Sequence, residues 1–142
     1  MAMNFGATHI INSKDSDLAE TVLEILGQQP DVVVDGTGNP DIISTAYELT
    51  GTPGRTVLFG VMHHEQRVRL HTLPLHFGKV LTGSVGGSSQ PAQDIPRYIR
   101  MIQDSRFDPG NFVSHRMPLD QINEGIQQMR DGKVVHAMVH FN

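Results

Sequence analysis

The strongest constraint on the fold is residues 32–40, where three consecutive valines are followed at once by Asp35, two glycines, an asparagine and Pro40. A short strand without polar alternation must be covered on both faces, as in parallel sheets flanked by helices. Ligand sites in such sheets lie at the carboxyl ends of the strands. The segment therefore predicts an α/β fold with a nucleotide-binding loop at residues 35–39.

Composition narrows the classes of protein to which the chain can belong. Its 142 residues suffice for one ordinary core, and the formal charge of −4 offers no basic surface to nucleic acid. No apolar run reaches the roughly 20 residues needed to cross a bilayer, and the amino terminus lacks a secretion signal. We expect a cytoplasmic protein that binds neither nucleic acid nor membrane. Because the chain contains no cysteine, it can form neither a disulfide nor a thiolate zinc site.

Strand and helix patterns alternate along the chain. Expected strands cover residues 9–12 (His9 to Asn12), 32–34, 55–61, 80–85 and 134–141, and shorter extended segments cover 68–70 and 113–115. Gly6 is expected to end a helical turn, residues 74–79 to form one or two helical turns, and Phe107 to begin a turn that runs to Asn111.

The helices between these strands have recognisable ends. Ser16 or Asp17 is expected to cap the first and Gly27 to end it, and Pro40 fits the first turn of the second. Asp94 and Asp120 are expected to cap two later helices, the last of which ends at Gly132. The expected buried positions of the second and third helices are Ile42, Ile43, Ala46 and Leu49, and Ile95, Tyr98, Ile99 and Ile102.

Several segments resemble the carboxyl-terminal part of medium-chain, zinc-type alcohol dehydrogenases. They are AMNFGAT at 2–8, VDGTG at 34–38, GRTVLFGV at 54–61, PLDQINEG at 118–125 and MRDGK at 129–133. Their order and spacing together make the match specific. The resemblance implies a partial doubly wound (Rossmann-like) parallel sheet with flanking helices at residues 2–112. Residues 113–142 would form a helix and strand that pack on the catalytic domain in full-length relatives.

The resemblance also implies parts that this sequence lacks. No G-x-G-x-x-G turn is present to hold a pyrophosphate, and the strand whose acidic end would bind the adenosine ribose is also missing. The family's zinc ligands belong to a preceding catalytic domain. We therefore expect a fragment of an enzyme that uses NAD or NADP, with weak or no cofactor binding by this chain alone. The sequence identifies neither the substrate nor which of the two cofactors is used.

The resemblance implies cofactor contacts at three strand ends. They are Asp35, Gly36, Thr37 and Gly38 on the adenosine and ribose side, and Phe59, Gly60, Val61, Ser84 and Val85 near the nicotinamide carboxamide. The alternative is that these residues form ordinary turns and strand ends. We expect no metal-binding residue, because His63, His64, His71 and His76 have the spacing of surface loops and no metal motif. We also expect no catalytic residue, because Asp35 has no positioned partner and the serines lack the order of a catalytic triad.

Two interpretations of function remain open. In the first, the chain is part of an NAD(P)-dependent alcohol dehydrogenase, forms one wall of the cofactor cleft and is not catalytic alone. In the second, it is an oligomeric binding module with a vestigial cleft. In either case the strands from Val32 to Val34 and from Leu81 to Val85 would be sheet edges, and we expect them to pair in a homo-oligomer.

Overall fold

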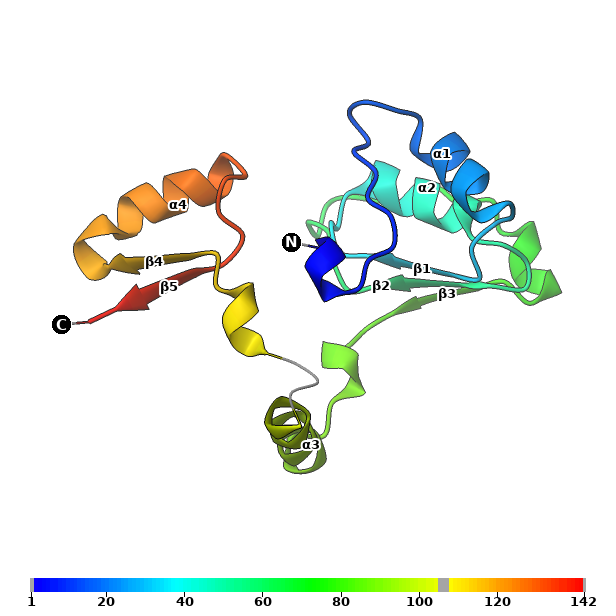
Figure 1. Ribbon diagram of the computed structural model, residues 1–142. Coiled ribbons are helices and arrows are strands. Elements are labelled where there is room, and N and C mark those ends of the chain that lie inside the picture. The colour runs from blue at the N-terminus through cyan, green and yellow to red at the C-terminus, as the bar shows by residue number, and fades with distance from the viewer. Residues whose placement is uncertain (1, 105–107, 142) are drawn as a thin grey trace. The chain divides into compact units, whose positions relative to one another are not determined.

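The computed structural model describes residues 2–104 and 108–141. The chain divides between Ser88 and Ser89 into two compact units, each of which has its own parallel sheet (Figure 1). Among the described residues, no helix is both long and apolar enough to cross a membrane. The expected domain border between residues 112 and 113 stays a prediction.

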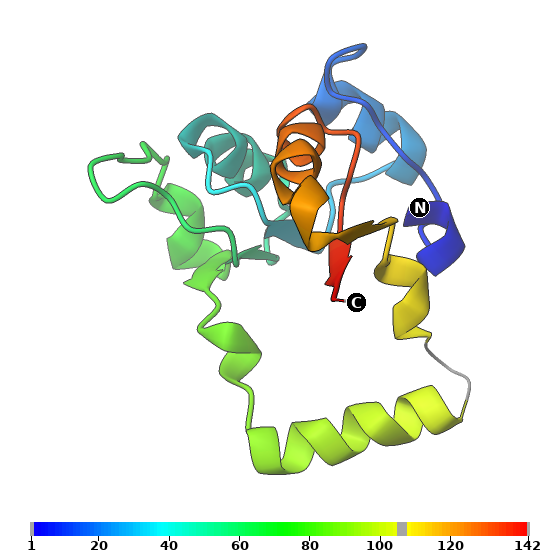
Figure 2. The same cartoon turned by 90° about the vertical axis from the view of Figure 1, so that its left-hand side faces the viewer.

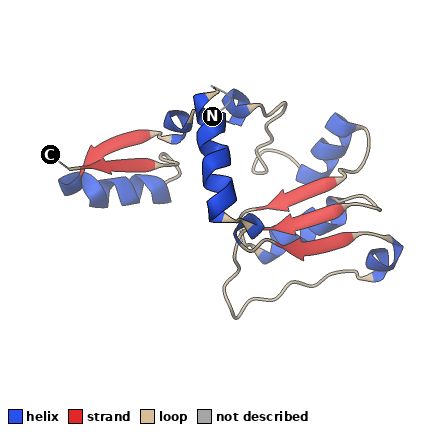
Figure 3. Ribbon diagram, turned by 90° about the horizontal axis from the view of Figure 1, so that it is seen from below, coloured by secondary structure: helices blue, strands red, loops and turns tan. Residues whose placement is uncertain are grey.

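The first unit contains a three-stranded parallel sheet. Its strands are β1 (Val32–Asp35), β2 (Arg55–Leu58) and β3 (Val80–Gly83), in the order β1-β2-β3. In Figure 3 all three arrowheads lie at the same end of the sheet. The parallel α/β fold predicted from the valine run is confirmed. The predicted coverage of this strand on both faces is wrong, because Val32 and Val34 are 58% and 56% exposed. β2 and β3 end earlier than predicted, so residues 59–61 and 84–85 lie in the loops after them.

Two helices lie on the same side of this sheet in Figure 1, α1 (Leu18–Leu26) and α2 (Pro40–Leu49). A carboxylate oxygen of Asp17 accepts a hydrogen bond from Glu20 N at 3.0 Å, and Gly27 ends α1 with φ 68°. Asn39 Oδ1 caps α2 by accepting from Asp41 N at 2.9 Å. The predicted boundaries at Asp17, Gly27 and Pro40 are confirmed, because these signals act within one turn of chain.

The core of the first unit lies between α2 and the sheet. Ile43 and Tyr47 are each 1% exposed, and burying side chains of this size contributes roughly 1.5–3 kcal/mol each. Thr50 and Thr56 are fully buried, and their hydroxyls are 2.7 Å apart. Ala46 and Leu49 are buried as predicted, whereas Ile42 is only half-buried.

Two strand predictions in this unit are wrong. Residues 9–12 and 68–70 have no strand conformation. A strand requires a neighbour to complete its hydrogen bonds, and within the described chain the sheet ends at β1 on one side and β3 on the other. Predictions over nearby turns are confirmed: a 3-10 helix spans Ala2–Phe5 before Gly6 (φ 93°), and another spans Leu73–Phe77.

The second unit pairs β4 (His115–Pro118) with β5 (Ala137–His140) in parallel. Helix α4 (Ile122–Arg130) lies on one side of these strands (Figures 1 and 2). A Cβ on Gly125 would lie 2.3 Å from Met117 Sδ, so glycine lets α4 approach β4 closely. Met117 and Val134 are 6% and 4% exposed and form the small core of this unit.

Several boundaries in the second unit differ from the prediction. Helix α3 (Pro91–Gln103) begins before Asp94, whose Oδ2 instead accepts from Gln90 N at 2.7 Å. Asp120 lies in a 3-10 turn, Leu119–Gln121, and does not cap α4. Gly132 follows α4 with φ 71°, as expected. Of the turn predicted at residues 107–111, Phe107 lies outside the described residues, and a 3-10 helix spans Pro109–Phe112.

The predicted burial of one face of α3 is also wrong. Its four apolar positions are 40% to 57% exposed: Ile95, Tyr98, Ile99 and Ile102. Their spacing correctly indicates a helix with an apolar side, but the spacing alone does not supply a surface to cover that side.

Candidate functional site

The loop after β1 is organised around the carboxylate of Asp35. Its Oδ1 accepts from Thr37 N at 3.1 Å and from Thr37 Oγ1 at 2.6 Å, while its Oδ2 accepts from Gly38 N at 3.1 Å. The Thr37 hydroxyl in turn accepts from Asn39 N at 3.1 Å. Asp35 is 3% exposed, so this side chain fixes the loop from within and presents little surface to a ligand.

These bonds set the protonation of Asp35. Burial favours the neutral acid, but the hydrogen bonds from the Thr37 hydroxyl and from the Thr37 and Gly38 amides favour the carboxylate more strongly. The pKa of Asp35 therefore lies below its ordinary value, and the residue is ionised at neutral pH. A carboxylate with these partners is a structural anion and a poor general base.

Glycines bring the loops after β1 and β2 into direct contact. A Cβ on Gly60 would lie 2.5 Å from both Gly36 C and Gly38 N, and a Cβ on Gly36 would lie 2.4 Å from Phe59 Cζ. Gly38 has φ 65°, and a Cβ there would lie 2.5 Å from Val61 O. Backbone packing between the two loops thus favours glycine at positions 38 and 60, whereas the nearest atoms at Gly36 belong to the exposed Phe59 ring, which can move.

The loop after β3 continues the same edge. Ser84 N donates to Leu58 O at 2.8 Å, which extends the pairing of β2 and β3 by one bond. Ser84 Oγ then accepts from Gly87 N at 3.0 Å. Val85, which follows, is 88% exposed, and Val61 at the end of the neighbouring loop is 91% exposed.

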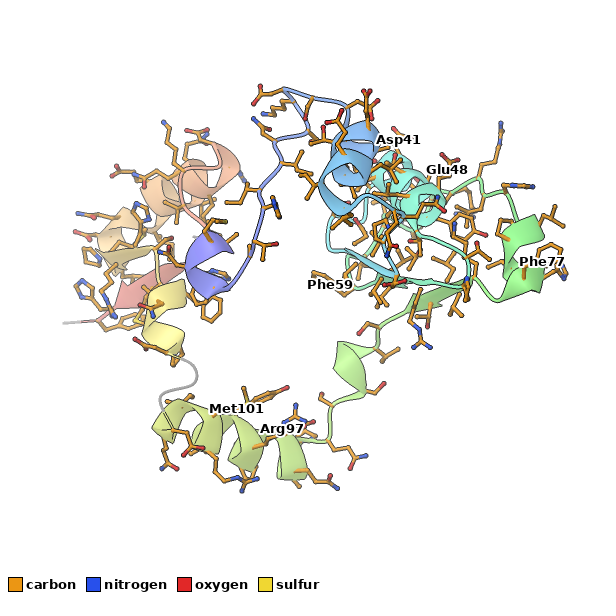
Figure 4. All side chains as sticks on the ribbon, turned by 45° about the vertical axis from the view of Figure 1, so that its right-hand side comes forward. Asp41, Glu48, Phe59, Phe77, Arg97 and Met101 are labelled. Carbon is orange, nitrogen blue, oxygen red and sulfur yellow. The ribbon has the colours of Figure 1, made fainter. Side chains whose placement is uncertain are left out.

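An open depression of about 660 Å³ lies along this edge. Figure 4 labels Phe59 there, at the end of the first unit opposite Phe77. Five predicted cofactor residues line the depression: Phe59, Gly60, Val61, Ser84 and Val85. The four in the first loop, Asp35, Gly36, Thr37 and Gly38, do not line it and support it from behind through the glycine contacts.

Sequence reasoning missed part of the lining. The loop after Val61 contributes Met62, His63, His64, Gln66 and Arg67. The sequence signal was their position directly after a strand end, since loops at the carboxyl edge of a parallel sheet surround its ligand site. Sequence spacing alone favours surface-loop histidines over metal ligands at these positions and indicates no other role.

The described residues do not offer a zinc site. They hold no cluster of three or more His, Asp or Glu side chains with metal-binding geometry, and the whole sequence is free of cysteine. Glu65 carboxylate oxygens lie 3.9 Å from His63 Nδ1 and 3.8 Å from His64 Nε2, too far for hydrogen bonds.

A parallel sheet flanked by helices, with glycine-bearing loops along its carboxyl edge, is the architecture of dinucleotide-binding domains. Residues 1–104 match the family model for zinc-binding dehydrogenases. The chain therefore belongs to the zinc-binding dehydrogenase family, and its fold is Rossmann-like as predicted.

Individual relatives agree with this assignment. An S-(hydroxymethyl)glutathione dehydrogenase of Haemophilus influenzae is 30% identical, covering 99% of this chain and 38% of its own length. Alcohol dehydrogenase-like 3 of Arabidopsis thaliana is 29% identical over 96% of this chain and 36% of its own length. The structure of benzyl alcohol dehydrogenase from Acinetobacter calcoaceticus superposes with a TM-score of 0.89 at 27% identity, covering 99% of this chain and 39% of that one. The chain thus spans less than two fifths of these relatives.

Proposed function

We propose that this chain forms one wall of the NAD(P) cleft of an alcohol dehydrogenase and contributes no catalytic side chain of its own. The observation that carries the proposal is the joined set of loops along the sheet edge. Gly60 packs on the loop of Asp35, and the exposed Val61 and Val85 both line the same depression.

The nicotinamide half of a dinucleotide fits this edge. Exposed apolar side chains of Val61 and Val85 offer a surface for one face of a flat ring, and the adjoining backbone supplies amide and carbonyl groups for its carboxamide. When bound, the cofactor supplies the hydride acceptor of the reaction. The role of this chain is to orient that ring and to exclude water from one side of it.

The described residues give less support for binding of the pyrophosphate part of a dinucleotide. The amino terminus of α2 is close to Asp35, but Asn39 already caps it and Asp41 adds a negative charge in its first turn. Both features oppose an anion at that helix end. We therefore expect the chain alone to bind a dinucleotide weakly or not at all.

Zinc has no set of ligands among the described residues, so no step of the reaction is assigned to a metal held by this chain. The cytoplasmic location expected from the sequence stays a prediction.

An exposed sheet edge supports the second interpretation, an oligomeric interaction module. Val32 and Val34 of β1 are 58% and 56% exposed, and β1 has one unpaired side in the described sheet. Pairing of β1 or β3 with a second copy would cover such an edge. Light scattering after size exclusion should then give a dimer or larger species, whereas a strict monomer at micromolar concentration contradicts the oligomer.

Two assays test the main proposal. Calorimetric titration with NADH and NADPH should give millimolar or weaker dissociation constants. The purified chain should not oxidise alcohols with NAD or NADP. A micromolar dissociation constant would contradict the proposal that this chain forms only one wall of the cofactor cleft. Full dehydrogenase activity would contradict the absence of catalytic side chains.

A further inference from the structure

The turn after β2 presents three potentially cationic side chains at the depression. Gln66 N donates to His63 O at 3.0 Å, and Arg67 Nη1 donates to the carbonyl oxygens of His64 and Gln66 at 2.9 Å and 2.8 Å. These bonds tie the guanidinium to the backbone of its own turn. Because arginine carries five N–H donors, donors remain for a ligand.

Much of the remaining lining of the depression is apolar. Phe59, Val61 and Val85 are 60%, 91% and 88% exposed, so an apolar strip lies beside the turn that carries His63, His64 and Arg67. A site with this lining suits a ligand that has an apolar body and one charged end.

Neighbouring acids do not cancel the positive side of the depression. Glu65 lies 3.9 Å from His63 and 3.8 Å from His64, but its side chain is 78% exposed, and exposed ion pairs at such distances are worth at most about 1 kcal/mol. Asp41, which lines a neighbouring hollow together with Arg67, is also exposed. The carboxylate of Asp35 is buried and occupied by Thr37 and Gly38.

We propose that this depression binds a ligand with an anionic oxygen group, a carboxylate or a phosphate, attached to an apolar body. The anionic group meets Arg67 and the two imidazoles, for which a planar guanidinium is a well-matched donor, and the body lies on Val61 and Val85. The inference rests on the proposed function, because it names the charge of the group that enters the same cleft. A carboxylate would belong to a substrate and a phosphate to a nucleotide.

The test uses three small probes on the full 142-residue chain. Benzoate, benzyl alcohol and inorganic phosphate are titrated separately while backbone amide and imidazole NMR shifts are followed. Benzoate should bind more tightly than its neutral analogue benzyl alcohol, with shifts at residues 61–67 and Val85. Tighter binding of benzoate than of phosphate assigns the site to a substrate acid, and the reverse order assigns it to a nucleotide phosphate.

Two arginines two positions apart provide a matched pair of variants. Arg67→Gln should weaken benzoate binding about tenfold and leave benzyl alcohol binding unchanged. Arg69→Gln removes the same charge outside this depression and should change neither. A His63→Gln/His64→Gln double variant should also weaken benzoate binding.

Equal affinities for benzoate and benzyl alcohol, an equal loss in both arginine variants, or no binding of either anion would overturn the inference. Unchanged amide shifts in β1 to β3 establish that each variant is folded. Since no probe contains a dinucleotide, these outcomes count against the inference alone, whereas micromolar binding of NADH or full dehydrogenase activity of the chain would count against the proposed function alone.

Discussion

Gly60 stands so close to Gly36 that a Cβ on Gly60 would lie 2.5 Å from the Gly36 carbonyl carbon. This contact joins the loops after β1 and β2, which are two of the three strand ends at which the sequence predicted cofactor residues. The glycines therefore have a structural role that holds whether or not a ligand is bound.

Substituting Gly60 by alanine should destabilise the fold by about 1–3 kcal/mol, because the added methyl group meets backbone atoms that cannot move independently. Gly83→Ala is the matched control, since no atom lies within 4 Å of a Cβ at that strand end. Urea unfolding of both variants measures the difference. Equal stabilities of the two variants would contradict the close packing of the loops.

Asp35→Asn should cost about 1.5–3 kcal/mol at neutral pH, because the loop loses hydrogen bonds to a charged acceptor. The folded-state pKa of Asp35 is lowered, so its stabilising contribution is complete above the unfolded value of about 3.9. That contribution is lost as the pH falls through the lower folded pKa.

Urea unfolding of the wild-type chain and of Asp35→Asn, measured from neutral pH downward, tests whether the stabilising contribution of Asp35 is lost on acidification. The gap between them should close below about pH 4. The exposed Asp41→Asn serves as control and should show no comparable gap. A gap that widens on acidification would show that the pKa of Asp35 is raised.

The buried threonine pair gives an asymmetric prediction. Thr50 Oγ1 donates to Ala46 O at 2.7 Å, so the 2.7 Å bond between the hydroxyls must have Thr56 as donor. In Thr56→Val the Thr50 hydroxyl keeps its hydrogen bond to Ala46 O, so the free energy of unfolding should fall by only about 1 kcal/mol. In Thr50→Val the buried Thr56 hydroxyl loses its acceptor, so the free energy of unfolding should fall by about 1–3 kcal/mol.

The double variant Thr50→Val/Thr56→Val should be no less stable than Thr50→Val alone, since it leaves no hydroxyl unpaired at this site. Thermal or urea unfolding of the three variants completes the cycle. Equal costs for the two single variants would mean that the assigned donor direction is wrong.

Local signals account for most of what the sequence predicted correctly. Asp17, Pro40 and Gly27 mark helix ends through features that act within one turn, and the valines of β1 indicate a parallel strand, although not its exposure. The prediction at His9 to Asn12 failed because a strand depends on a partner distant in sequence. The predicted burial of one face of α3 failed for the same reason, because periodicity shows that a helix has an apolar side but does not show which surface covers it.

The candidate site was predictable in part for the same reason. The switch from strand to glycine-bearing loop located Asp35, Phe59 and Ser84 at one edge. The sequence could not show that Gly36 and Gly60 support each other, because that contact joins loops more than twenty residues apart. Nor did it show that His63, His64 and Arg67 face the depression.

Chemical-shift mapping with nicotinamide mononucleotide tests the central claim most directly. At millimolar ligand, shifts should centre on the amides that line the depression, which are those of Phe59, Gly60, Val61, Ser84 and Val85 and of the adjoining residues 62–64, 66 and 67. AMP at the same concentration is the control and should instead shift the loop of residues 35–38. If nicotinamide mononucleotide instead shifts mainly the amides of α4 and β5, a cofactor-cleft role for this chain is contradicted. The same holds if no amide along the carboxyl edge of β2 and β3 shifts.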